Sequence, residues 1–212
     1  AIDTHDTVGH DLVGMVVDDI VVVGARPLFM TDYIACGKLV PERIASLVGG
    51  IAEACALTGT ALVGGETAEH PGLLGPNDYD LAGAATGVVE ADRMLGAERV
   101  RDGDVVLALG SSGLHSNGYS LVRHIVANAG LSYGDLAADF GTTWGEALLT
   151  PTRLYTTPLL EVIDAVRQPG LPAAEAEGIH ALTHVTGGGI AANLARVLPA
   201  GSWVELDRST WS

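Results

Sequence analysis

The sequence predicts an α+β fold built in two parts, and three observations support this. Segments with helical apolar spacing alternate with strand-like apolar runs along the chain. Charged residues and a turn signal cluster at residues 90–103, which indicates a boundary between one domain at 1–91 and another at 92–212. The 212 residues are 48% hydrophobic and only 5% aromatic, so we expect a substantial core made of aliphatic side chains and alanine.

The first predicted domain contains two helices and three strands, each marked by local signals. Asp6 or Thr7 can cap the first helix, and Gly24 can end it. Pro41 opens the second helix, because proline is favoured at the first helical position. The predicted elements are a helix at 8–23, a strand at 28–36, a helix from 41 through 52, a strand at 60–63 and a strand at 79–89.

The second predicted domain begins with the apolar run 105–109, which is typical of a buried strand. Its other predicted elements are helices at 117–129, 152–167 and 189–198, a strand at 180–185 and a strand-like end at 203–206. The composition of residues 168–178 indicates a flexible surface insertion.

Charge and composition exclude several classes of partner. The formal net charge of −15, with Lys38 as the single lysine, argues against nucleic acid, since phosphate backbones need a basic surface. No apolar run reaches the roughly 18 residues of a membrane-spanning helix, so no membrane partner is expected. We interpret Cys36 and Cys55 as buried thiols of a reducing, cytoplasmic protein. A free nucleotide fits so acidic a chain if Mg²⁺ bridges carboxylates and phosphates.

Two segments rich in glycine and small polar residues each lie between a predicted strand and a predicted helix. Residues 110–123 read GSSGLHSNGYSLVR, and residues 183–194 read THVTGGGIAANL. Backbone N–H groups at a helix start, together with the helix dipole, favour anions and most often phosphate. Thr186 is expected to cap the second of these helices. The sequence therefore predicts a ligand among phosphorylated small molecules.

Four acidic residues are candidates for ligand contact. Asp18 and Asp19 lie near the end of the first helix, where carboxylates oppose the helix dipole unless a cation compensates them. We expect Asp18 to face water and Asp19 to contact a metal ion or a metal-bound phosphate. Glu66, after a strand and a Gly-Gly pair, is either a ligand contact or a solvent-exposed turn residue. Asp32 is either a ligand-facing acid or, as we favour, a charge on an edge strand.

His115 lies in the first glycine-rich segment, close in sequence to Ser112 and Asn117. A neutral imidazole there can hydrogen-bond a substrate oxygen, and a protonated one can meet a phosphate. The alternative is a loop histidine whose ring is satisfied by the backbone. The chain carries no Walker sequence, no Gly-x-Gly-x-x-Gly before a helix and no Gly-x-Ser-x-Gly nucleophile elbow.

Four blocks of sequence resemble the aminoimidazole ribonucleotide (AIR) synthetase family, the phosphoribosylformylglycinamidine cyclo-ligases, in the same order and spacing. The blocks are HDTVGHDLVGMVVDDIVVVGARPLFMTDY (5–33), LVGGETAEHPG (62–72), GSSGLHSNGYSLVR (110–123) and HVTGGG (184–189). The resemblance implies a two-domain α+β fold. Its N-terminal mixed sheet would pair across a homodimer into a barrel, and a C-terminal α/β sandwich domain would follow.

The resemblance implies a ligase of purine biosynthesis that cyclises formylglycinamidine ribonucleotide to 5-aminoimidazole ribonucleotide, with ATP converted to ADP and phosphate. ATP would first phosphorylate the formyl amide oxygen, because this turns a poor leaving group into a good one, and Mg²⁺ would offset the phosphoryl charge. Two alternatives stay open. One is another ATP-using enzyme of the superfamily, similar to formylglycinamidine synthetase, and the other is a non-catalytic nucleotide-binding dimerisation fragment.

The matching positions imply roles for individual residues. Asp19 and Glu66 would hold Mg²⁺ and, with Gly64 and Gly65, would contact ATP. His115 and His184 would be the catalytic residues. The positions implied to bind the ribonucleotide are Ser112, Asn117, Thr186, Gly187, Gly188 and Gly189.

The chain also departs from the family pattern. Asp18 stands where Asn is usual, and His70 stands where Met is usual. The family's early Gly-Thr-Asp-Gly-Val-Gly-Thr-Lys loop, which contacts ATP phosphates, would precede Ala1, and its last strands and helix would follow Ser212. We therefore expect a chain truncated at both ends relative to the family.

Overall fold

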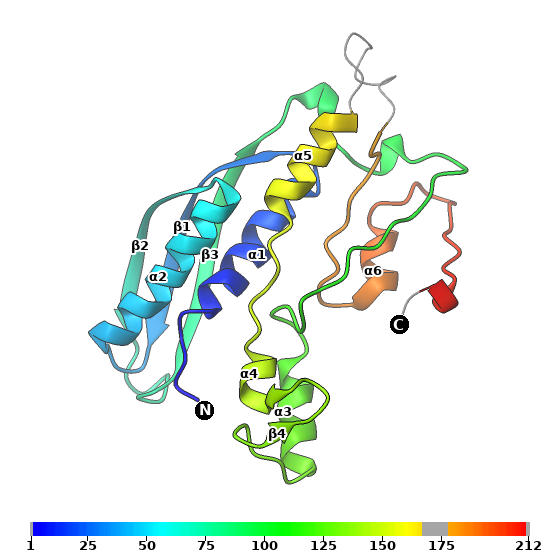
Figure 1. Cartoon of the computed structure of the whole chain (residues 1–212). Helices are drawn as coiled ribbons and strands as arrows, with labels where there is room; N and C mark the ends of the chain where they lie inside the picture. Colours follow the sequence, from blue (N-terminus) through cyan, green and yellow to red (C-terminus); the bar gives the residue numbers. More distant parts are fainter. Residues whose placement is uncertain (1, 167–177, 211–212) are drawn as a thin grey trace.

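The computed structural model describes residues 2–166 and 178–210 of the chain. A three-stranded sheet forms one layer, and helices α1 (Val8–Val21) and α2 (Pro41–Thr58) pack side by side against it (Figure 1). Helix α5 (Thr156–Val166), from the other half of the chain, lies alongside both helices. Helices therefore cover one face of the sheet.

The sheet is mixed, as predicted. Strand β1 (Arg26–Cys36) is central, parallel to β2 (Ala61–Glu69) and antiparallel to β3 (Tyr79–Val88). The pairing with β2 shifts by one residue between Met30 and Thr31. Because β1 and β2 are parallel, the chain needs a crossover connection from the end of β1 to the start of β2, and α2 forms this connection.

Alternate residues of β1 face opposite sides of the sheet. Met30 and Ile34 are fully buried beneath the helices. Phe29 and Tyr33, which point the other way, are 41% and 36% exposed. Within the described part of the chain this second face, which we call the open face, has no covering layer.

Two glycines let α1 and α2 approach closely. A Cβ added to Gly9 would lie 2.2 Å from the carbonyl carbon of Gly50, so neither helix tolerates a larger residue at this crossing. The core below the crossing is aliphatic, as the composition predicts. Its buried members are Val13, Val17, Met30, Ile51, Ala54 and Cys55.

The first half of the chain matches the predicted order of elements, with two corrections. Thr7 occupies the N-cap position of α1, but its hydroxyl makes no capping bond and is buried without a partner. Strand β2 continues to Glu69, so Gly64, Gly65 and Glu66 lie inside a strand and not in a turn after it. Hydrogen bonding to β1 keeps this glycine-rich stretch extended.

In its described residues, the second half of the chain contains short helices and one pair of short strands. It joins the first half through a second cluster of buried residues, formed by Val21, Leu95, Leu160 and Ile163. Its elements are η1 (Ala91–Arg93), η2 (Ala97–Arg99), α3 (Tyr119–Asn128), β4 (Leu136–Ala137), β5 (Thr142–Thr143), α4 (Trp144–Leu148), α5, α6 (Gly189–Ala195) and η3 (Arg208–Thr210).

Three predicted strands of this half are wrong. Residues 105–109, 180–185 and 203–206 form neither strand nor helix, and Val105 and Leu107 are 82% and 85% exposed. A strand needs a hydrogen-bonding neighbour, and β4 and β5 pair only with each other among the described residues. The α/β sandwich expected for this half is therefore not formed there.

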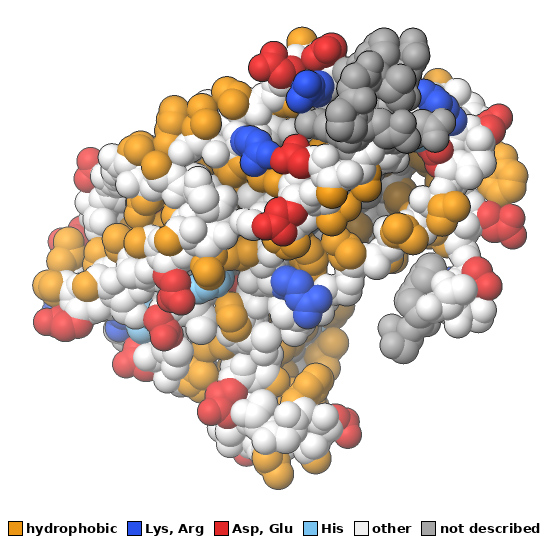
Figure 2. All heavy atoms as spheres, turned by 45° about the horizontal axis from the view of Figure 1, so that its top comes forward, with side chains coloured by type: hydrophobic (Ala, Val, Ile, Leu, Met, Phe, Trp, Pro, Cys, Tyr) orange, Lys and Arg blue, Asp and Glu red, His pale blue; other side chains and the backbone are white. Residues whose placement is uncertain are grey.

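Other outcomes of the sequence analysis concern composition and surface. Cys36 and Cys55 are free and buried, as predicted. No helix in the described residues is long and apolar enough to cross a membrane. Acidic side chains outnumber basic ones on the face shown in Figure 2, in keeping with the net charge of −15. The predicted insertion at 168–178 lies, except for Gly178, outside the described residues.

Candidate active site

The first glycine-rich turn contacts one side of α1. Ser116 Oγ donates to the carbonyl oxygen of Asp11 at 3.5 Å, and Asn117 Nδ2 donates to Met15 Sδ at 3.7 Å. Ser116 has a φ of 53°, in the left-handed region that most side chains avoid, so the turn carries backbone strain where it meets the helix. Strain of this kind is concentrated at functional sites.

The second glycine-rich turn reaches the same side of α1. His184 Nδ1 lies 2.9 Å from Asp19 Oδ1, near the C-terminal end of the helix. The two turns are neighbours, because a Cβ added to Gly187 would lie 3.7 Å from Asn117 Oδ1. The structure thus brings together the predicted residues of both turns and Asp19.

His115 is oriented by the backbone around it. Its Nε2 accepts hydrogen bonds from the backbone N–H of Ser112 at 3.0 Å and from that of Arg153 at 3.4 Å. Ser112 Oγ lies 2.8 Å from the same nitrogen and also donates to the carbonyl oxygen of Pro151 at 2.7 Å. Burial lowers the pKa of His115 from its usual value, and the positive charge of Arg153 contributes to this.

Two carboxylates on α1 hold the segment 152–156 in place. Asp11 Oδ1 accepts from the backbone N–H and the hydroxyl of Thr152 at 3.0 and 2.6 Å. Two turns later, Asp18 accepts from the Thr156 hydroxyl at 2.7 Å and from the Tyr155 N–H at 3.4 Å. Burial raises the pKa of both carboxyl groups, and the hydrogen bonds from the threonines oppose this effect.

The segment 152–156 brings two residues to the site that sequence reasoning missed. Arg153 Nη1 and Tyr155 Oη both donate to the carbonyl oxygen of Gly110, at 3.0 and 2.8 Å. The chain has only eleven basic residues, so an arginine beside a predicted phosphate-binding turn is a notable cation. Its separation of 43 positions from Gly110 left no local signal of this contact.

The turn before α6 is built differently from the prediction. Gly188, with a φ of 96°, is the N-cap residue, so Thr186 does not cap the helix. Asn193, which is fully buried, donates to the carbonyl oxygen of Gly189 at 2.8 Å and to those of Thr186 and Gly187 at 3.4 Å. A buried amide thus shapes the glycine turn from inside.

The two adjacent aspartates have opposite environments. Asp18 is 3% exposed, so the expectation that it faces water is wrong, whereas the Asp19 side chain is 62% exposed. Residues next to each other on a helix point about 100° apart, and packing of α5 onto α1 selects the face of Asp18 for burial. The exposed Asp19 is left to pair with His184.

Glu66 is not placed with Asp19. It pairs in register with Tyr33 and is exposed on the open face, whereas α1 covers the other face of the sheet. No three His, Cys, Asp or Glu side chains gather into a metal-binding group anywhere in the described ranges. The two carboxylates therefore do not fit a Mg²⁺ site within one chain.

Asp32 is buried in the central strand, so its assignment to an edge strand is wrong. A Cβ added to Gly65, its partner on β2, would lie 2.2 Å from Asp32 Oδ1. The glycine therefore makes room for this carboxylate, whose pKa is raised by burial. On the open face, Tyr33 Oη lies 2.7 Å from His70 Nε2.

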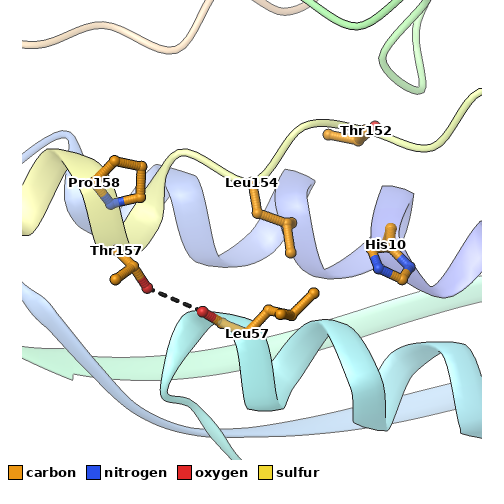
Figure 3. A pocket seen from close by; sticks show the side chains of 6 residues that line it. All are labelled: His10, Leu57, Thr152, Leu154, Thr157 and Pro158. Atoms are coloured by element: carbon orange, nitrogen blue, oxygen red, sulfur yellow. Dashed lines mark hydrogen bonds between the residues drawn. The ribbon is translucent and has the colours of Figure 1, made fainter.

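A pocket of about 320 Å³ lies beside the segment 152–156, between α1, α2 and α5 (Figure 3). Its lining is mainly apolar, and the Thr157 hydroxyl donates across it to the carbonyl oxygen of Leu57 at 3.0 Å. The residues that line it are His10, Leu57, Thr152, Leu154, Thr157 and Pro158. None of the predicted site residues is among them.

Comparison with known protein families gives two matches. Residues 1–89 match the N-terminal domain, and residues 101–210 the C-terminal domain, of the AIR synthase related proteins. These two models together cover most of the chain.

Curated relatives carry a consistent name. The chain is 49% identical over 211 residues to the phosphoribosylformylglycinamidine cyclo-ligase of Exiguobacterium sibiricum, and 48% identical over 207 residues to that of Xanthomonas campestris pv. campestris. The matches cover 100% and 98% of this chain but 58% of each relative. The chain thus spans a little over half the length of the curated relatives it matches.

Solved structures show the same fold at lower identity. The E. coli HypE structure matches with a TM-score of 0.55 and 20% identity, and the match covers 90% of this chain and 52% of the HypE chain. The thiamine-monophosphate kinase from Stenotrophomonas maltophilia matches with a TM-score of 0.51 and 21% identity, and the match covers 79% of this chain and 50% of the kinase chain. At this level of identity the likeness concerns the fold alone.

Proposed function

Because this chain belongs to the AIR synthase related protein family, we propose that it performs the reaction of a phosphoribosylformylglycinamidine cyclo-ligase. The enzyme would convert formylglycinamidine ribonucleotide and ATP into 5-aminoimidazole ribonucleotide, ADP and phosphate in purine biosynthesis. The observation that carries this proposal is the 49% identity to a cyclo-ligase over 211 residues, which includes both glycine-rich turns.

The chemistry requires activation of an amide oxygen and then ring closure. Phosphoryl transfer from ATP to the formyl amide oxygen creates a leaving group, and the neighbouring nitrogen attacks the same carbon as phosphate departs. Holding that nitrogen against the activated carbon makes the attack intramolecular, so positioning supplies much of the rate. The convergence of the two turns on α1 supports a role of this kind for residues from both halves of the chain.

We assign the ribonucleotide to the two glycine-rich turns. Ser112, Asn117 and the turn Thr186–Gly189 would contact it, with His115 and His184 next to the reacting groups. Arg153 joins this set, since its guanidinium is held against Gly110 at the start of the first turn. Such a cation would offset the charge of a substrate phosphate in an acidic protein.

We assign ATP contacts to Asp19, Gly64, Gly65 and Glu66 residue by residue, because these residues do not form one cluster in a single chain. Asp19 and Glu66 lie on opposite sides of one sheet, so they do not form one metal site in a single chain. Mg²⁺ would therefore enter the site bound to the phosphates of ATP, and it would offset charge on the transferred phosphoryl group.

A homodimer is part of the proposal. The open face exposes apolar side chains, among them Phe29 at 41%, Val63 at 61% and Val88 at 54%. Two such faces in contact would remove these groups from water, as the barrel of the family implies. In that arrangement Glu66 would lie near the partner subunit. We propose the cytoplasm as the compartment, which agrees with two free buried cysteines.

The activity is tested by adding formylglycinamidine ribonucleotide, ATP and Mg²⁺ to the intact purified protein. The expected result is one 5-aminoimidazole ribonucleotide formed per ADP released. ADP release that requires ammonia and formylglycinamide ribonucleotide would instead favour a formylglycinamidine synthetase. ATP binding by calorimetry with no turnover of either substrate would contradict catalysis and support a binding fragment.

A further inference from the structure

The hydrogen bonds around His115 determine which ring nitrogen carries its proton. The backbone N–H groups of Ser112 and Arg153 both point at Nε2, at 3.0 and 3.4 Å. An amide N–H can only donate, so Nε2 must present a lone pair to them. A neutral imidazole with a bare Nε2 carries its hydrogen on Nδ1.

We infer that His115 is held as the Nδ1–H tautomer and acts as a neutral hydrogen-bond donor to an acceptor oxygen of the substrate, not as a proton acceptor. The substrate part of this inference rests on the proposed function. The tautomer itself rests only on the geometry of residues 112–115 and 153. This tautomer favours a neutral imidazole that hydrogen-bonds a substrate oxygen over a protonated imidazole that meets a phosphate.

The hydroxyl of Ser112 fits this arrangement when its hydrogen is directed at Nε2. Ser112 Oγ accepts from the Arg153 N–H at 3.1 Å and has a single hydrogen to donate, either to His115 Nε2 at 2.8 Å or to the Pro151 carbonyl at 2.7 Å. A proton added to Nε2 would face two amide hydrogens. Protonation would therefore break the contacts that orient the ring.

The charged groups around His115 come from three elements. Asp11 and Asp18 on α1 favour its protonation, whereas His184 in the second turn and Arg153 oppose it. Burial is the largest influence, and the resulting pKa lies below the usual 6.5 of histidine. The lowered pKa favours the neutral ring, in agreement with its hydrogen bonds.

The opposite ring nitrogen is available to a ligand. Within the described residues, His115 Nδ1 makes no hydrogen bond. It is also not one of the fully buried polar atoms that lack a partner. The ring of Tyr155 lies on one side, with centroids 6.2 Å apart. A neutral N–H donor of this kind suits a carbonyl or phosphoryl oxygen on which negative charge develops.

The tautomer is tested by ¹⁵N NMR of the intact protein labelled in histidine, with His115→Asn to identify the signals. The expected spectrum at neutral pH shows a protonated Nδ1 and a bare Nε2, and the ring titrates only below the usual histidine pKa of about 6.5. A protonated Nε2, or titration at or above pH ~6.5, would overturn the inference. Ser112→Ala is the matched control, because it keeps the backbone N–H. A change of tautomer in that variant would assign control to the hydroxyl and contradict the inference.

The role toward substrate is tested by kinetics. His115→Asn keeps an N–H group on the atom bonded to Cγ, where Nδ1 lies, whereas His115→Gln moves the amide one bond outward and His115→Ala removes it. We expect kcat/KM to fall by about 10²-fold in the Gln and Ala variants and clearly less in the Asn variant. Loss of a titrating group from the pH profile of His115→Asn would show that His115 acts as a base. Absence of turnover in the unmodified protein would refute the proposed function while leaving the NMR result intact.

Discussion

Asp18 accepts a hydrogen bond from the hydroxyl of Thr156 at 2.7 Å, although 138 positions separate the two residues. Both are buried, with exposures of 3% and 0%. Asp11 and Thr152 make the equivalent contact two turns earlier on α1. These contacts fasten the segment that carries Arg153 and Tyr155, so the stability of the α1–α5 interface and the geometry of the candidate site are linked.

Replacing Thr156 by valine keeps the shape of the side chain but removes the hydroxyl. Asp18 then retains only backbone N–H contacts, from Tyr155 at 3.4 Å and from Thr156, and the loss of a hydroxyl partner from a buried acceptor destabilises by about 1–3 kcal/mol. We expect the free energy of unfolding, measured with urea at neutral pH, to fall by this amount. Thr156→Ser keeps the hydroxyl and should lose less. Equal stability of Thr156→Val and the unmodified protein would contradict a stabilising role for the contact.

Stability should depend on pH through Asp18. Burial raises its pKa above the 3.8 of the unfolded chain, so the folded state binds the proton more tightly. The stabilisation from this protonated form is complete below pH 3.8 and is lost as pH rises through the folded-state pKa.

Asp18→Asn has no such titration. Its stability relative to the unmodified protein should therefore improve as pH rises above about 4, as measured by urea unfolding at several pH values. The same trend is expected for Asp11→Asn, since burial also raises the pKa of Asp11. A stability difference that does not vary with pH would show that the carboxyl group has the same pKa in both states.

The two neighbouring glycines of β2 should respond differently to alanine. A Cβ at Gly65 would lie 2.2 Å from Asp32 Oδ1, whereas one at Gly64 meets nothing within 4 Å. We expect Gly65→Ala to lower the free energy of unfolding by about 1–3 kcal/mol, with Gly64→Ala close to neutral. Adding Asp32→Ala should relieve part of the penalty at Gly65. Additive effects in this double-mutant cycle would argue against the steric explanation.

Arg153→Met should weaken binding of the ribonucleotide. The guanidinium is the positive charge next to the first turn, and loss of one charge-assisted contact corresponds to about a tenfold to hundredfold rise in KM. KM for ATP and the melting temperature should change little. Arg123→Met, at an exposed position on α3, is the control. An equal rise in the KM of both substrates would place Arg153 outside the ribonucleotide site.

Local signals predicted much of the first half of the chain. The helical apolar spacing at 8–23 and from 41 through 52 predicted α1 and most of α2, and the strand predicted at 79–89 is β3 to within one residue. The glycine-rich turns were also found this way, since turn residues act locally. The three wrong strands show the limit of the method, because an apolar run becomes a strand only where another strand can pair with it.

The sequence by itself determined the approximate positions of α1, α2, α3, α5 and α6, and which residue types are available to contact a phosphorylated ligand. Only the tertiary structure decided that Asp18 is buried and Asp19 exposed, that Glu66 faces away from α1, and that Arg153 lies beside Gly110. The physical reason is that backbone conformation follows from neighbours in sequence. The rotation of a helix and the partners of a side chain follow from what packs against it.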